Sequence, residues 1–210
     1  MKLGKFISIE GQDGAGKTTN IELICNELES KNIDYIATRE PGGTPLGESI
    51  RDILLSRSEL DIMPMSELLL MFAARAQHLE SIIMPALNKG AWVVCDRFTD
   101  ASYAYQGGGH GINPNVIKEL AIMVQGSLQP DITFLLDVDA AMGESRVNTR
   151  NEEKDRFEMQ KIDFKQRVRS AYLQLAKSRS ERIKLIDAGQ EIEAVKAQIK
   201  TNLITFINQN

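Results

Sequence analysis

Residues 6–19 read FISIEGQDGAGKTT, and this stretch decides the fold. Its first four residues are an apolar run that predicts a buried strand, and the pattern over 18–30 predicts a helix. Between them, residues 11–18 match G-x-x-x-x-G-K-[ST], a loop whose backbone N–H groups surround phosphate oxygens at a helix N-terminus. In such loops the lysine reaches the β- and γ-phosphates and the last hydroxyl reaches Mg²⁺. The predicted nucleoside triphosphate site consists of Gly11, Gln12, Asp13, Gly14, Ala15, Gly16, Lys17, Thr18 and Thr19.

The rest of the chain alternates short apolar runs with longer helical patterns. Strands are predicted at residues 6–9, 34–38, 92–95, 132–136 and 183–186, and helices at 18–30, 66–88, 114–126, 157–180 and 192–207. Several strands are continuously apolar, as in a parallel sheet covered by helices on both faces. We therefore expect an α/β fold, a three-layer α/β/α sandwich around a parallel five-stranded sheet, in one domain over residues 1–210. Glycine clusters predict loops at 41–43 and 107–111.

Composition narrows the class of protein. The 210 residues include 25 basic and 29 acidic side chains, and this balance argues against a nucleic-acid-binding or polybasic membrane protein. A hydrophobic content of 42% excludes a disordered or collagen-like chain. Cys25 and Cys95 are too few for a disulfide scaffold, and we interpret them as thiols in a reducing compartment. Because no apolar run approaches the roughly 18 residues of a membrane helix, we expect a cytoplasmic protein.

Asp96 follows the predicted strand at 92–95, where open α/β sheets bind ligands. Next to a phosphate-binding loop, we interpret this carboxylate as a Mg²⁺ ligand together with Thr18; the alternative is an N-cap for the following helix. No Asn-Lys-x-Asp sequence, the motif that reads guanine, occurs in the chain, and its absence argues against a GTPase. Arginines instead cluster in predicted loops and suit a phosphoryl transfer between two nucleotides, and they are Arg39, Arg97, Arg146, Arg150 and Arg156.

Four segments resemble those of bacterial thymidylate kinases, which are P-loop nucleoside monophosphate kinases. They are FISIEGQDGAGKTT, TREPGGT, DRFTDASYAYQGGG and LLDVDAAMGESR. This resemblance implies that the chain phosphorylates dTMP to dTDP with Mg²⁺-ATP by direct in-line transfer, and that it forms a homodimer. The alternatives are a kinase for another monophosphate, such as dUMP or a cytidylate, and a P-loop protein that senses ATP without turnover.

The resemblance also implies roles for residues around the acceptor. Asp13 matches the aspartate that faces the sugar 3′-hydroxyl, Arg39 and Arg97 match the arginines that hold the dTMP phosphate, and Pro41 matches a proline that follows a cis peptide bond. Three further positions match residues around the nucleoside, namely Ser102 and Gln106 at the thymine edge and Tyr105 beneath the deoxyribose.

Two positions of the predicted helix at 66–88 and a charged segment complete the expected site. Arg75 should donate to a base carbonyl, and we expect Phe72 to stack on the base, although Met71 or a purely structural Phe72 is the alternative. Residues 146–158 are expected to form a lid, in which Arg146 stacks on adenine and Arg150 contacts the transferring phosphoryl group; Arg156 is the alternative donor. The expected catalytic residues are Asp13, Lys17, Arg97 and Arg150.

Overall fold

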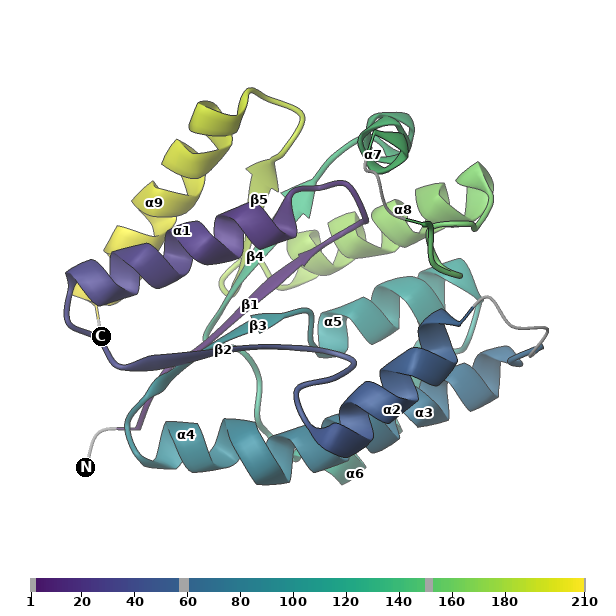
Figure 1. The fold of residues 1–210 in the computed structure, drawn as a ribbon, viewed down its shortest axis with the longest axis horizontal. Coiled ribbons are helices and arrows are strands. Elements are labelled where there is room, and N and C mark those ends of the chain that lie inside the picture. The colour runs from purple at the N-terminus through teal and green to yellow at the C-terminus, as the bar shows by residue number, and fades with distance from the viewer. Residues whose placement is uncertain (1–2, 57–60, 150–152, 210) are drawn as a thin grey trace.

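The computed structural model describes residues 3–56, 61–149 and 153–209. In these residues five parallel strands form one sheet in the order β2-β3-β1-β4-β5 (Figure 1). The strands are β1 (Phe6–Gly11), β2 (Tyr35–Arg39), β3 (Trp92–Asp96), β4 (Ile132–Asp137) and β5 (Ile183–Asp187). Ser8 of the central strand pairs with Cys95 on one side and Thr133 on the other. The predicted five-stranded parallel sheet is confirmed, and the strand ends differ from the predicted ones by one or two residues.

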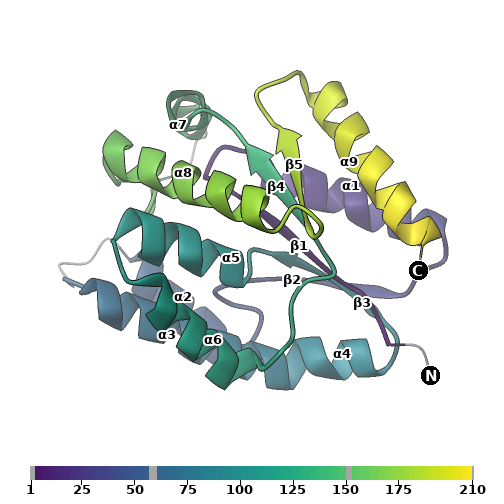
Figure 2. The ribbon, with the colours of Figure 1, turned by 180° about the vertical axis from the view of Figure 1, so that it is seen from behind.

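Helices cover both faces of the sheet, which gives the three layers (Figures 1 and 2). On one face lie α1 (Lys17–Ser30) and α9 (Ile192–Asn208), which contact each other. The other helices and helical turns are α2 (Pro45–Leu55), α3 (Pro64–His78), η1 (Leu79–Ile83), α4 (Met84–Asn88), α5 (Thr99–Ser102), η2 (Tyr103–Gly109), α6 (Pro114–Gln125), α7 (Ala140–Asn148) and α8 (Ile162–Ser178). None of the helices in the described part of the chain has the length and apolar character needed to cross a membrane.

The core explains why the strands read as apolar runs. All six residues of β1 are buried, because the strand is in the middle of the sheet and helices pack on both of its faces. Ile7 and Ile9 face the layer of α1 and α9, whereas Phe6 packs with η1, α4 and Phe98 on the opposite face. Burial on both sides removes the period-two alternation that marks a half-exposed strand.

Two predicted helices begin or continue differently from the prediction. The helix at 66–88 is three segments, α3, the π-helical η1 and α4, and the backbone N–H of Met84 donates to the carbonyl of Leu79. Pro85 has no N–H to donate, so the regular hydrogen-bond ladder is interrupted near this position. The helix at 157–180 begins only at Ile162, because the Asp155 side chain accepts from the backbone N–H groups of Phe157 and Glu158 and holds a turn there.

The predicted glycine loop at 107–111 is wrong for residues 107–109, which belong to the π-helical η2. Tertiary packing requires small residues here, because η2 lies directly against α8. A Cβ atom at Gly108 would come within 2.5 Å of the Ala171 Cβ, and one at Gly109 within 2.5 Å of the Phe164 ring. The glycines therefore mark a close helix–helix contact and not a break in the helix.

The strand order brings three of the sequence motifs to one edge of the sheet. β1, β3 and β2 are neighbours and parallel, so the segments that follow them leave the sheet at the same side. These segments are the glycine-rich loop after β1, Asp96 and Arg97 at the end of β3, and the turn at Glu40 and Pro41 after β2. Ligands of open α/β sheets bind at such an edge, in the crevice at the point where the strand order reverses.

Candidate active site

The loop between β1 and α1 has the backbone of a phosphate-binding loop. Gly14 and Gly16 have φ angles of 79° and 89°, which side-chain-bearing residues rarely adopt, and Gly16 is the N-cap of α1. Lys17 Nζ lies across the loop and donates to the carbonyls of Gly11 and Gln12 at 3.1 and 3.0 Å. Burial and the nearby Arg97 lower the pKa of this ammonium group. The loop thus presents backbone N–H groups and one buried cation to an anion at the start of a long helix.

A cavity on one side of the loop connects it with α7 and with the turn between β5 and α9. Arg146 NH1 donates to the carbonyl of Ala188 at 2.9 Å, which places its guanidinium at the wall of this cavity. The cavity is lined by Gly14, Ala15, Gly16, Thr19, Asn20, Met142, Arg146, Ala188, Gly189, Gln190, Glu191, Ile192 and Val195. Apolar and peptide groups beside a phosphate-binding loop suit the base and ribose of a nucleotide.

Thr18 and Asp96 offer oxygen ligands near the loop. Thr18 is exposed in the first turn of α1, and Asp96 ends β3 with a buried Oδ1 that has no hydrogen-bond partner among the described residues. Within residues 3–56, 61–149 and 153–209, no group of three or more His, Cys, Asp or Glu side chains is arranged to hold a metal ion. A hard divalent cation bound by these two side chains would take its remaining ligands from phosphate groups and water. Phe98, and not Asp96, is the N-cap of α5, so the N-cap interpretation of Asp96 is wrong.

A second cavity lies on the other side of Asp13. Its lining comes from the loop, the turn after β2, the helices α2, α3, α5 and η2, and the segment before α8. The lining residues are Asp13, Glu40, Pro41, Arg51, Leu55, Met71, Arg75, Arg97, Phe98, Ala101, Ser102, Tyr105, Gln106, Asp155 and Phe157. Apolar walls with a few charged and amide groups are typical of a site for a small polar ligand.

Arg97 connects the phosphate-binding loop with the second cavity. Its NH2 group donates to Asp13 Oδ1 at 2.7 Å and to the Tyr105 hydroxyl at 2.9 Å, and its guanidinium lies over the Tyr105 ring. Arg97 has a φ angle of 68°, a strained conformation for a residue with a side chain that is typical of functional sites. Burial raises the pKa of Tyr105, so its phenol is neutral and can donate a hydrogen bond. These contacts hold a cation between the phosphate-binding loop and the second cavity.

Below the loop lies Glu10, a fully buried carboxyl group at the end of β1. It accepts from the backbone N–H of Phe98 at 2.7 Å, and its second oxygen lies 2.7 Å from the Tyr172 hydroxyl. Burial, and then the nearby Asp100, raise the pKa of Glu10 to about 8. This carboxyl group is therefore largely protonated at neutral pH. It holds the backbone of Phe98 and the Tyr172 hydroxyl beside the site without adding a full negative charge.

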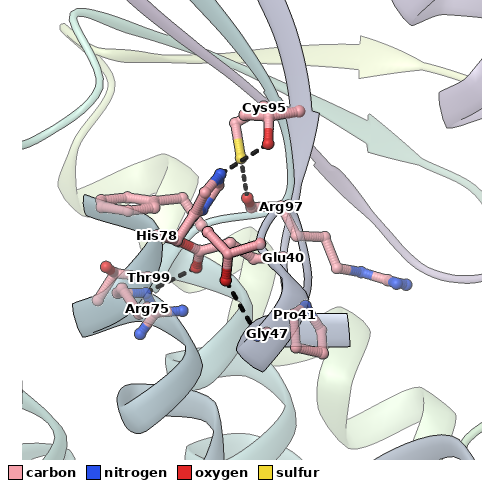
Figure 3. A network of polar contacts seen from close by, with 12 residues as sticks. Glu40, Pro41, Gly47, Arg75, His78, Cys95, Arg97 and Thr99 are labelled. Carbon is pink, nitrogen blue, oxygen red and sulfur yellow. Dashed lines mark hydrogen bonds and ion pairs between the residues drawn. The ribbon is translucent and has the colours of Figure 1, made fainter. Parts of the chain in front are cut away.

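A buried polar network orients Arg75 in the second cavity (Figure 3). Arg75 Nε donates to Glu40 Oε2 at 2.7 Å, and its two terminal nitrogens lie 3.3 Å from the Ser102 hydroxyl. His78 is fully buried and lies between Glu40 Oε1 at 3.1 Å and the Thr38 hydroxyl at 2.6 Å. Because the Glu40 carboxylate can only accept, His78 donates to it through Nδ1. The negative charge of Glu40 balances Arg75, which then acts as a directed donor.

The comparisons with known proteins agree with one another. A family model described as thymidylate kinase matches residues 9–199. The thymidylate kinase of Ruthia magnifica is 52% identical over 200 residues, covering 95% of this chain and 97% of the relative, and that of Nitrosospira multiformis is 50% identical over 203 residues, covering 97% and 98%. A crystal structure of thymidylate kinase from Ehrlichia chaffeensis matches with a TM-score of 0.78 at 35% identity, covering 96% of this chain and 99% of that one.

The chain belongs to the thymidylate kinase family. Its reaction is the phosphorylation of dTMP to dTDP with ATP, and the family uses a divalent metal with this donor. For a thymidylate kinase, the second cavity is the candidate acceptor site, and the structure brings six of the predicted dTMP-binding residues into its lining. These are Asp13, Arg75, Arg97, Ser102, Tyr105 and Gln106. The expected cis peptide bond before Pro41 is confirmed.

Arg39, predicted to bind the dTMP phosphate, is not part of the cavity lining. Its side chain is half exposed and forms an ion pair with Glu48 at 2.9 Å. Arg51 lines the cavity instead and donates to the carbonyl of Pro41 at 2.9 Å. Sequence reasoning missed Arg51 because it missed α2. The signal for that helix was present, since Thr44 precedes Pro45 and caps α2 through its side chain.

Phe72, predicted to stack on the thymine base, lies in the core. It is 2% exposed and packs with Leu68 of the same helix and with Ile117 and Ala121 of α6. Met71 lines the acceptor cavity together with Arg75. The reason is the phase of the helix: residues four apart share a face, as Met71 and Arg75 do, and the face of Phe72 is turned toward α6.

Two of the three arginines of the predicted lid, Arg146 and Arg156, lie within the described residues, and their side chains have different contacts. Arg146 lines the first cavity, the one between the phosphate-binding loop, α7 and the turn after β5. Arg156 does not point to the phosphate-binding loop, since its Nε donates to the carbonyl of Leu54 at 2.8 Å and its NH2 group forms an ion pair with Glu67. Arg150, the expected contact of the transferring phosphoryl group, lies outside the described residues.

Proposed function

We propose that this member of the thymidylate kinase family transfers the γ-phosphoryl group of ATP directly and in line to the phosphate of dTMP. The observation that supports this most strongly is the hydrogen bond from Arg97 NH2 to Asp13 Oδ1, 2.7 Å long. It holds the Arg97 guanidinium between the phosphate-binding loop and a cavity lined by groups that can hydrogen-bond a nucleoside. Catalysis of phosphoryl transfer rests mainly on positioning and on neutralising charge. A cation held rigidly between two phosphate sites meets both needs, and no covalent enzyme intermediate is required.

On the acceptor side, we assign the dTMP phosphate to Arg97 and Arg51, with Arg39 available if its exposed pair with Glu48 opens. Arg75 and Ser102 would contact the thymine carbonyl edge, and Gln106 the ring N3–H. Two further residues border the sugar in this assignment: Tyr105 lies beneath the deoxyribose and leaves no room for a 2′-hydroxyl, and Asp13 accepts from the 3′-hydroxyl. Met71 replaces Phe72 as the side chain that packs on the base.

On the donor side, the loop residues 11–19 would hold the ATP phosphates, with Lys17 at the β- and γ-phosphates and Arg146 at the adenine. Thr18 and Asp96 would hold Mg²⁺, and the free buried Oδ1 of Asp96 fits this assignment. When bound, the ion neutralises charge on the ATP phosphates. Arg150 is our candidate for the arginine at the transferring group, because Arg146 and Arg156 have other contacts.

We also propose that residues 1–210 form one catalytic domain with a lid at about 146–158, and that two copies associate. The support for a homodimer is the exposure of large apolar side chains on α3 and α6, two helices that contact each other: Leu69, Ile122 and Met123 are 50%, 58% and 79% exposed. A second copy of the chain would cover these side chains if it packed on the two helices. We place the enzyme in the cytoplasm, as its two free cysteines suggest. Sedimentation equilibrium should give twice the chain mass, and a monomer at every concentration would contradict association.

The assignment is tested with an acceptor panel. Purified protein with Mg²⁺-ATP should release ADP rapidly with dTMP, and much more slowly with dCMP, dGMP or thymidylate that carries a 2′-hydroxyl. Equal rates across the panel would contradict the acceptor site assigned to thymine and deoxyribose. Binding of ATP without turnover on any acceptor would instead support the sensor alternative.

The lid arginine has a separate test. Arg150→Ala should lower kcat by about two orders of magnitude or more while the KM for dTMP changes little, because this cation is expected to act mainly in the transition state. An unchanged kcat would assign the role to another lid residue.

A further inference from the structure

Glu67 is a buried carboxylate with three partners, two from η2 and its C-cap and one from the segment before α8. It lies in the first turn of α3 and is fully buried. Gln106 of η2 donates through Nε2 to Glu67 Oε1 at 2.8 Å, and His110 Nε2 lies 3.3 Å from the same oxygen. Arg156, from the segment before α8, forms an ion pair with Glu67 Oε2. Glu67 does not line the acceptor cavity, but Gln106 does.

The charge of Glu67 decides which end of the Gln106 amide can face it. Burial alone would raise the pKa of Glu67, but the contacts from its three partners outweigh burial and lower it, so the group is ionised at neutral pH. An ionised carboxylate accepts hydrogen bonds and cannot donate one. The amide nitrogen of Gln106 must therefore face Glu67. None of the described residues donates a hydrogen bond to the remaining amide oxygen, Gln106 Oε1.

The direction of this amide distinguishes the pyrimidine bases. Thymine and uracil carry a hydrogen on ring atom N3, whereas N3 of cytosine is an acceptor. An amide oxygen turned toward the base can accept from the first kind of ring and repels the second. If the amide were reversed, its NH₂ group would favour cytosine. A wrong ligand that leaves a buried polar group of the site without a hydrogen-bond partner binds much more weakly than the right one, so such a group discriminates strongly.

We propose that Glu67 is a positioning residue that fixes the Gln106 amide with its oxygen toward the base and thereby selects acceptors with an N3–H donor. This inference rests on the proposed function, in which Gln106 contacts thymine. Glu40 orients Arg75 in the same manner, because a buried carboxylate directs each base-reading group. The two carboxylates thus orient one hydrogen-bond donor, Arg75, and one acceptor, Gln106 Oε1. These match the O4 acceptor and the N3–H donor of thymine.

The test is Glu67→Gln, assayed by kcat/KM for dTMP and dCMP. A glutamine at this position can donate as well as accept, so the Gln106 amide is free to reverse. The preference for dTMP over dCMP should fall by roughly tenfold or more, with most of the change in KM. If Glu67 serves only to hold the fold or the segment of Arg156, activity with both acceptors should fall in parallel and the preference should remain, which would overturn the proposal.

Two control variants separate this effect from its alternatives. Arg156→Gln removes the ion pair with Glu67 but leaves the carboxylate, so the preference for dTMP should be kept. Gln106→Ala should lower the preference by itself, and adding Glu67→Gln to it should change nothing further. An unchanged preference in Gln106→Ala would show that the proposed base contact is wrong. A lowered preference in Gln106→Ala but not in Glu67→Gln would overturn the role of Glu67 alone.

A measurement on the unaltered protein covers the case in which Glu67→Gln does not fold. The side-chain NH₂ signals of Gln106 in a ¹⁵N-labelled sample can be assigned by their loss in Gln106→Ala. Because this group faces a buried carboxylate, its protons should exchange slowly with water before dTMP is added and should shift little afterwards. Rapid exchange without dTMP, or a large shift on binding, would place the NH₂ group toward the base and overturn the proposal.

Discussion

Glu40→Gln tests whether the buried ion pair with Arg75 holds the acceptor site in shape. The side chains are 5% and 2% exposed, and Glu40 Oε2 lies 2.7 Å from Arg75 Nε. Glutamine keeps the size of the side chain and can still accept from Arg75, but it leaves a buried positive charge without its counter-charge. Removing one partner of a buried pair costs about 3–5 kcal/mol of the free energy of unfolding. For a chain of this length, the lower value corresponds to a fall in Tm of roughly 6–12 °C.

The assay is thermal unfolding in the absence of ligands, followed by kinetics with dTMP. Glu193→Gln is the matched control, because Glu193 is 80% exposed and pairs with Lys196 at 2.8 Å on the surface of α9. An exposed pair contributes at most about 1 kcal/mol. Glu40→Gln should also raise the KM for dTMP by about tenfold, since a neutral amide holds the Arg75 guanidinium less firmly in the acceptor cavity than a carboxylate does. If Glu40→Gln unfolds at the same temperature as Glu193→Gln and keeps the KM, the reasoning is refuted.

Three further predictions concern the floor, the wall and the packing of the site. Burial raises the pKa of Glu10 from 4.5 to about 8. Between these pH values the folded protein keeps the proton and the unfolded chain has lost it, so the free energy of unfolding falls as the pH rises, by up to about 1.4 kcal/mol per pH unit. Glu10→Gln should therefore make the urea midpoint less dependent on pH, and an unchanged dependence would contradict the assignment. Met71→Ala should raise the KM for dTMP with little loss of Tm, whereas Phe72→Ala should cost about 3–5 kcal/mol in urea unfolding; the reverse pattern would restore Phe72 as the base-packing residue. Gly109→Ala should destabilise the protein by about 1–3 kcal/mol, because the new Cβ would lie within 2.5 Å of the Phe164 ring, and an unchanged urea midpoint would contradict the packing of η2 on α8.

The parts of the fold that could be predicted from sequence are those with strong local signals. The phosphate-binding loop follows from glycine and lysine spacing, and the central strands from continuous apolar runs that only burial on both faces explains. Ser102, Tyr105 and Gln106 were placed by resemblance, and all three line the acceptor cavity. Local sequence and family pattern therefore located most of the candidate site.

The errors arose where tertiary packing decides. The glycines at 107–109 look like a loop, but they are helical because α8 approaches too closely for side chains. Phe72 looks like a base-stacking aromatic, but the direction of its side chain depends on where α6 packs. Arg39 is the last residue of β2 and pairs with Glu48, and only the three-dimensional path of α2 shows that Arg51 reaches the cavity. Hydrophobic periodicity predicts which side chains share a face of a helix, but not which element packs against that face.

The central claim is that the phosphoryl group passes directly between two nucleotides bound on either side of Asp13 and Arg97. The most direct test is the stereochemical course at phosphorus, with ATP made chiral at the γ-position by oxygen isotopes and dTMP as acceptor. A single in-line transfer predicts inversion of configuration in the dTDP formed. Retention would require a second transfer through a phosphorylated enzyme and would contradict the account.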